Sequence, residues 1–287
     1  MIDLKQFIHQ PNQIKNSSLY YDKFVFSEKR LMEKDNTISD EINRVLNGDT
    51  RNENIKNNRN KLKRDLASRK IDDVLERQIK ERYKDILINI ATRELKEKIE
   101  LAKRLRINMI KSLKNRYRIL SYEIYTKTPF LIGAGIPSID EVGFYWSRNL
   151  GLPIIPGTTL KGAFRKFLEL KNSTFIDSIF GKEDNKGDAI FLDTIPIDNI
   201  ELGKEFQAPH FQNYYSKNKA PNDIYNPVPI NYLSVFKGKF RLDIIIEKNN
   251  DEIFKEIESN IKEFLEFYGL GAKTSMGYGR FNISRQL

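Results

Sequence analysis

The sequence contains no cysteine and only two histidines, His9 and His210. Disulfide bonds and thiol catalysis are therefore excluded, and the ligands that a dedicated zinc site needs are missing, so we expect no metal and no cofactor. The chain also lacks a run of eighteen apolar residues that could span a membrane. Its first residues lack the apolar core and cleavage site of a signal peptide, so we expect a cytoplasmic protein.

Glycine and proline are both absent from Asp49 to Thr128, which predicts that this stretch is mostly helical. We expect two or three basic helices, with breaks near Ile71 and Thr92. Apolar residues recur there every three to five positions and trace a narrow stripe. The stripe contains Leu62, Leu66, Leu75, Ile79, Ile86, Ile90, Ile99, Ala102, Leu105, Met109 and Leu113.

The charge of the chain is strongly uneven. Residues 1–115 carry 27 Lys or Arg against 18 Asp or Glu, a net of +9, whereas residues 116–287 carry 22 against 21. Two interpretations of the N-terminal cations stay open. They can be the solvated face of amphipathic helices, or an arm that follows phosphates or docks on a partner.

After Asn115 the hydrophobic period changes, and strands and helices alternate. The pattern predicts strands at 117–126, 189–192, 230–246 and 278–283, with helices around 160–168 and 253–265. The order β, α, β, β, α, β is the split βαβ pattern of an α+β, ferredoxin-like (RRM-like) sandwich, with two helices on one face of an antiparallel sheet. We therefore divide the chain into a basic helical N-terminal region, 1–115, and a ferredoxin-like domain, 116–287.

The ferredoxin-like half is long for its fold, so it must contain insertions. The clearest one is Asp198 to Pro229, which combines four prolines with aromatic residues, Lys217 and Lys219. Loops of this length usually bind a ligand or contact another subunit.

The first motif runs from Leu152 to Arg165. Pro156 and Gly157 end an extended segment, and Thr158 or Thr159 can cap the helix that follows, whose first N–H groups form an anion site. Lys161 and Arg165 are four residues apart and share a face. A well-capped helix with ordinary surface cations would have the same residues.

The second motif is a glycine-rich loop from Gly269 to Phe281, centred on Lys273, Thr274 and Ser275. Its glycines permit positive φ values and close approach of the backbone, and the cation and hydroxyls suit a phosphodiester. A tight turn without a ligand is the alternative. The loop is not a Walker A motif, because Ala272 replaces the glycine before Lys273, and it is not a dinucleotide fingerprint, because it leads into a strand.

Together with residues 187–196, 209–215 and 227–233, these motifs resemble the RAMP superfamily of CRISPR effector proteins, and more narrowly the family of sixth subunits of type III-B (Cmr) complexes. The resemblance covers residues 116–287. It implies a non-catalytic subunit that binds the 3′ part of the guide RNA (crRNA), with target RNA as a further possible partner. It also implies contacts with the repeated backbone subunit and the first subunit of an antiviral ribonucleoprotein.

The candidate RNA contacts lie in three segments, and no residue is expected to be catalytic. They are Lys161, Arg165, Gly269, Gly271, Lys273, Thr274, Ser275, Gly277, Tyr278, His210, Lys217 and Lys219.

Two other functions fit the sequence less well. A metal-independent, repeat-processing endoribonuclease needs a general base and a cation, which His210 with Tyr214 and Lys217 could supply. A lone histidine in a proline-rich loop is more often a structural hydrogen-bonding group. A purely structural subunit is the other candidate, and it differs from an RNA-binding one in the salt dependence of its interactions.

Overall fold

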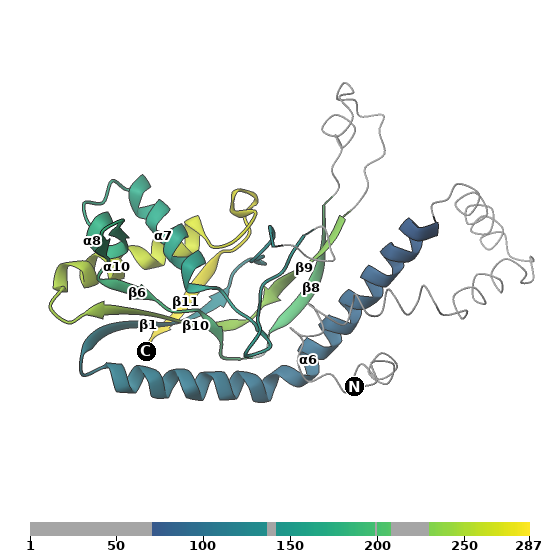
Figure 1. Cartoon of the computed structure of the whole chain (residues 1–287), viewed down its shortest axis with the longest axis horizontal. Helices are drawn as coiled ribbons and strands as arrows, with labels where there is room; N and C mark the ends of the chain where they lie inside the picture. The colour runs from purple at the N-terminus through teal and green to yellow at the C-terminus, as the bar shows by residue number, and fades with distance from the viewer. Residues whose placement is uncertain (1–70, 137–141, 199, 208–229) are drawn as a thin grey trace, which may run out of the picture. The chain divides into compact units, whose positions relative to one another are not determined.

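The computed structural model describes residues 71–136, 142–198, 200–207 and 230–287 (Figure 1). Its first described element, the helix α6 (Ile71–Leu113), crosses the boundary between two compact units, which falls between Leu87 and Ile88. The second unit contains Ile88–Leu287 and is described here by itself. Within the described ranges, no helix is long and apolar enough to span a membrane.

The second unit is built on one antiparallel sheet with the strand order β11-β1-β10-β6. Its strands are β1 (Tyr117–Thr126), β6 (Ala189–Phe191), β10 (Lys239–Glu247) and β11 (Phe281–Gln286), and the short β7 (Ile195–Pro196) also pairs with β10. Because β-branched and aromatic residues fill β1 and β10, both strands suit a pleated, buried position. All residues of β10 except the two at its ends are buried.

One face of this sheet carries the helices α7 (Gly157–Leu170) and α10 (Asp251–Glu263) (Figure 1). The fully buried Phe164 of α7 lies 5.1 Å from the Phe264 ring and 6.1 Å from the Phe191 ring, measured between ring centroids. Ring pairs at such distances contribute beyond the apolar area that they bury. An aromatic cluster therefore fixes α7 between the sheet and the turn that follows α10.

The opposite face carries the second half of α6 (Figure 1). The Arg106 guanidinium donates hydrogen bonds to Asp243 Oδ2 on β10, at 3.1 Å, and to the Asp193 carbonyl after β6, at 2.8 Å. The buried apolar residues of this half, with Arg106 between the last two, recur every three or four positions, as a packed helical face requires. They are Leu95, Ile99, Ala102 and Ile110. Helices thus cover both faces of the sheet.

Asp243 is the centre of a buried polar network. Its carboxylate is completely buried and accepts hydrogen bonds from the Ser121 hydroxyl at 2.5 Å and from Arg241 Nε at 2.9 Å, in addition to Arg106. Ser121 is the register partner of Asp243 on β1. A buried carboxylate is tolerated only with such partners, so the network fixes two strands and α6 together.

The remaining elements surround this sheet. They are β2 (Trp146–Ser147), β3 (Leu152–Pro153), α8 (Ile176–Phe180), β4 (Gly181–Lys182), β5 (Asn185–Lys186), β8 (Glu201–Gln207), β9 (Ile230–Lys237), the π-helical turn η3 (Phe264–Tyr268) and the 3₁₀ turn η4 (Thr274–Met276). The strands β8 and β9 form a two-stranded ribbon, and Val235 of β9 also bridges to Phe130.

The predicted mixture of helices and strands is confirmed, with several corrections. The break near Thr92 is wrong, because α6 is continuous there. Leu105 and Met109 are 55% and 36% exposed and do not belong to the buried stripe, because Arg106 occupies a sheet-facing position of α6. The last strand begins at Phe281 instead of Tyr278.

We predict that Asp243→Ala lowers the free energy of unfolding by about 3–5 kcal/mol, because it leaves Arg106 and Arg241 buried without their carboxylate. Urea unfolding of the full chain measures the change. The control is Lys237→Ala, which removes the exposed ion pair with Glu201 and should cost less than about 1 kcal/mol. Equal losses in the two variants would contradict the central role of Asp243.

Candidate nucleic-acid interface

The glycine-rich loop connects η3 to β11 and is fastened to the segment that follows β1. The Ala272 N–H donates to the Leu131 carbonyl at 2.8 Å, and the Gly279 N–H donates to the Pro129 carbonyl at 2.8 Å. Inside the loop, Arg280 Nη2 donates to the Thr274 carbonyl at 3.0 Å. Burial lowers the pKa of Arg280 from its usual value. The loop is therefore a braced structure that holds its tip in a defined position.

Three of its four glycines are needed for this internal bracing. Gly269, Gly271 and Gly279 have φ values of 82°, 94° and 73°. A Cβ atom at these positions would lie 2.1 Å from Arg280 Nη1, 2.4 Å from the Leu131 carbonyl oxygen and 1.9 Å from the Leu270 carbonyl oxygen, respectively. At these three positions the glycines allow close approach of other atoms of this chain, where the sequence predicted close approach of a ligand.

Gly277 is different. Its φ is also positive, 90°, but a Cβ atom added there would have no atom within 4 Å. It closes the loop tip, Lys273 to Gly277, in which Lys273 has a φ of 60° and Thr274–Met276 form η4. In the described part of the chain, the N–H groups of Lys273, Thr274 and Ser275 donate to no acceptor. A left-handed residue followed by helical ones directs successive N–H groups to one side and forms an anion-binding nest.

The Lys273 side chain extends over an aromatic ring. Its Nζ lies 3.8 Å from the ring centroid of Tyr232, which is buried in β9. The Tyr232 hydroxyl is 3.2 Å from the Tyr278 hydroxyl. Burial, with this hydrogen bond as a smaller cause, raises the pKa of Tyr278 well above its usual value. The cation–π contact holds the Lys273 ammonium group beside the loop tip.

The same contacts join the loop to the β8–β9 ribbon, near the ends of the two strands at Gln207 and Ile230. Glu205, the register partner of Tyr232, also raises the pKa of Tyr278. Two residues further along, Gln207 and Ile230 are the last register partners of the ribbon. The chain leaves the ribbon and returns to it at this point. His210, Lys217 and Lys219 belong to the intervening residues 208–229, which lie outside the described residues.

The start of α7 differs from the expected capped anion site. The residue before the helix is Pro156, and neither Thr158 nor Thr159 caps it. Instead, Asp193 Oδ1 accepts a hydrogen bond from the Gly157 N–H at 2.8 Å. A carboxylate of the chain already neutralises this helix N-terminus, so the predicted capping by threonine is wrong.

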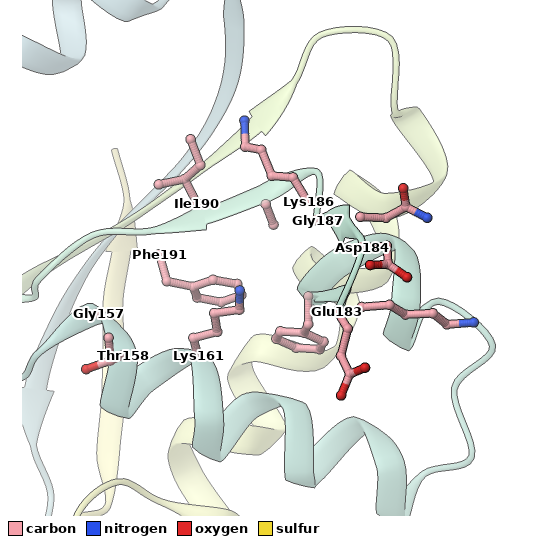
Figure 2. Close-up of a pocket in the computed structure, with 13 residues that line it drawn as sticks. Gly157, Thr158, Lys161, Glu183, Asp184, Lys186, Gly187, Ile190 and Phe191 are labelled. Carbon is pink, nitrogen blue, oxygen red and sulfur yellow. The ribbon is translucent and has the colours of Figure 1, made fainter.

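Lys161 and Arg165 both lie on α7, with different neighbours. Lys161 lines an open cleft of about 520 Å³ between α7, β6 and the β4–β5 turn, and its side chain extends toward Phe191 (Figure 2). Arg165 Nε donates to Glu169 at 3.1 Å. Hydrogen bonds from Lys166 and then from Arg165 lower the pKa of Glu169. The two predicted cations therefore share a helix, and no contact within the described residues joins them to Lys273 or Tyr232.

Several residues of the interface were not assigned a role from the sequence. Tyr232, Glu205 and Arg280 position the loop, and Asp193 occupies the start of α7. The partners of Tyr232 and Asp193 are distant in the sequence, so no local pattern indicates them. Among the residues that the structure describes, no group of three or more acidic or histidine side chains could hold a metal ion.

Comparison with known proteins gives concordant results. The model of the RAMP superfamily matches residues 123–282. The CRISPR system subunit Cmr6 of Saccharolobus solfataricus is 30% identical over 211 residues, which cover 71% of this chain and 72% of that protein. Cmr6 of Pyrococcus furiosus is 27% identical over 233 residues, which cover 58% of this chain and 68% of that protein.

A solved structure has the same fold. It is a chain of the type III-B Cmr-β complex bound to cognate target RNA, with a TM-score of 0.66 and 21% identity. The match covers 99% of this chain and 96% of that chain. The chain therefore belongs to the RAMP superfamily and, within it, to the Cmr6 family of CRISPR subunits.

Proposed function

We propose that the chain is a non-catalytic RNA-binding subunit of a cytoplasmic type III-B CRISPR (Cmr) effector complex that acts in antiviral defence. It binds the 3′ part of the guide RNA and contacts the repeated backbone subunit and the first subunit. Its Cmr6 relatives and the Cmr-β structure with target RNA support this assignment. The strand order β11-β1-β10-β6, with α7 and α10 on one face, supports a ferredoxin-like topology. A separate basic helical region at 1–115 stays a prediction.

The observation that carries the proposal is the loop tip. Three successive N–H groups without acceptors in the described chain lie at Lys273–Ser275, next to a fixed ammonium group and two hydroxyls. Backbone amides, Lys and Ser or Thr side chains are the groups that contact phosphate oxygens in protein–nucleic acid complexes. The tip is therefore suited to one phosphodiester of the RNA backbone.

The helices that cover both faces of the sheet also favour RNA binding at the loops. RNA-recognition domains stack bases on the open face of a four-stranded sheet. In this chain α6 covers the face opposite α7 and α10, and its Arg106 is bonded to Asp243 at the centre of the sheet. RNA bound by the second unit would therefore contact its loops, above all the loop tip, with Lys161 on α7 as a further contact.

The proposed subunit contacts have support on α6. Leu101, Leu105 and Met109 recur every four residues and are 45%, 55% and 36% exposed. An exposed apolar stripe of this kind is typical of a surface that another protein covers.

The alternative function is a metal-independent endoribonuclease that uses His210 as a base. Within the described residues, Tyr278 directly follows the loop tip, and its pKa is raised away from neutrality. A general base is most effective when its pKa lies near the working pH. Tyr278 therefore suits a structural role, and the alternative depends on His210 with Tyr214 and Lys217, which lie outside the described residues.

We predict that Lys273→Ala weakens binding of single-stranded RNA by the full chain about tenfold, because a charged contact to phosphate is lost. The dependence of log K on log salt should become shallower by about 0.7. Fluorescence anisotropy across a salt series measures both quantities.

The matched control is Lys248→Ala, which also removes one lysine. Lys248 directly follows β10, and its ammonium group donates to the Asn115 carbonyl. Binding by this variant should remain close to that of the unchanged chain. An unchanged salt dependence in Lys273→Ala would contradict a phosphate contact at the loop tip.

We predict that His210→Ala leaves any RNA cleavage by the assembled complex unchanged, since the proposed subunit performs no chemistry. Cleavage of a labelled target RNA by complexes containing either form of the chain measures this. Loss of one specific cleavage in the variant, with the complex still assembled, would favour the endoribonuclease.

A further inference from the structure

An exposed phenylalanine precedes the glycine-rich loop. Phe267 lies in η3, where the Gly269 N–H donates to the Phe264 carbonyl at 2.8 Å, one residue further back than in an α-helix. The neighbouring Tyr268 packs inward, 5.7 Å from the Phe167 ring and 5.8 Å from the Phe264 ring. Phe267 is 67% exposed. The π turn therefore presents one aromatic ring to solvent, and such turns are frequent at functional sites.

A cation lies beside this ring. Lys127, the residue after β1, places its Nζ 5.7 Å from the centroid of the Phe267 ring. Its backbone N–H donates to the Arg280 carbonyl at 2.8 Å, so its main chain is tied to the end of the glycine-rich loop. An aromatic face and an adjacent ammonium group are thus held together by backbone contacts.

The pair is connected to the loop tip through Arg280. The Arg280 carbonyl accepts from Lys127, and the Arg280 guanidinium donates to the Thr274 carbonyl. Arg280 Nη1 lies under Gly269, two residues after Phe267, and is buried without a partner in the described chain. Phe267, Lys127 and the loop tip therefore belong to one braced assembly, and a bound strand can contact all of it.

We infer that Phe267 and Lys127 form a subsite for one unpaired nucleotide of the RNA, with the base stacked on the Phe267 ring and a phosphate next to Lys127. This inference rests on the proposed RNA-binding function and deepens it. Single-stranded nucleic acids are held in this way, by aromatic rings that take the bases and cations that follow the backbone. Stacking is tolerant of base identity, so the subsite accepts any guide sequence.

The neighbouring groups favour a nucleotide over an apolar protein partner. A protein contact that buried Phe267 would also bring the Lys127 ammonium out of water, which is unfavourable without an opposing charge. A nucleotide supplies both the flat apolar surface and the negative charge. The loop tip also favours a negatively charged ligand, because its three N–H groups at Lys273–Ser275 have no acceptor in the described chain.

The test compares three substitutions at Phe267 in the full chain, with binding of a labelled single-stranded RNA measured by anisotropy. Phe267→Ala and Phe267→Leu should each weaken binding about tenfold, whereas Phe267→Tyr should retain it, because stacking needs an aromatic ring. Leu170→Ala removes an apolar side chain of similar exposure, 62%, from the end of α7 and should have no effect. Lys127→Ala should reduce the salt slope by about 0.7, and no Phe267 variant should change it.

Retained binding in Phe267→Leu, or in all three variants, would overturn the stacking subsite. If Lys273→Ala still weakens binding in that case, the proposed function survives and only the subsite fails. If the unchanged chain binds no RNA at any salt concentration, the proposed function itself fails, and the two failures are thereby distinguished.

Discussion

The buried carboxylate of Asp243 holds together the parts of the second unit that matter for function. It accepts hydrogen bonds from Ser121, Arg241 and Arg106, and thus joins the two central strands to α6. Arg106 also binds the main chain of Asp193, and the Asp193 carboxylate binds the first N–H of α7. One continuous set of polar contacts therefore runs from α6 through the sheet to the start of α7. Because Asp243, Ser121 and Arg241 are buried, each of these three depends on the others for its hydrogen bonds.

Under the proposed function, this network restricts where RNA can bind. The helix α6 is fixed on one face of the sheet, while α7 and α10 cover the other face (Figure 1). The helix dipole at α7 is already matched by Asp193, so the most available anion-binding groups are those of the loop tip. The loop tip is also joined to the β8–β9 ribbon through Lys273, Tyr232 and Tyr278. Local rigidity of this kind allows a backbone nest to select a phosphate without a large entropic cost.

The sequence predicts much of the fold, because its signals are local. The strand Tyr117–Thr126 has the predicted bounds, and the helix predicted around 160–168 is α7, whose buried face contains Leu160, Phe164, Phe167 and Leu168. The site is predicted less completely, because its contacts are long-range. Arg106 occupies a core-facing position only because Asp243, 137 residues away, is its partner. Likewise, glycine content marks a tight loop, but whether a Cβ would meet the chain or open space depends on the tertiary structure. Of the four glycines in the glycine-rich loop, Gly269, Gly271 and Gly279 pack against the chain, whereas Gly277 faces open space.

The most direct test of the account is to identify which residues of this chain touch RNA in the assembled complex. The complex is purified with its other subunits, washed in about 0.5 M salt to remove loosely held polyanions and irradiated with ultraviolet light. The linked peptides and the RNA attached to them are then sequenced. The account predicts links between guide RNA, in its 3′ part, and the peptide that contains Lys273 to Tyr278. Absence of links to this chain, or links confined to α6 and α7, would contradict it.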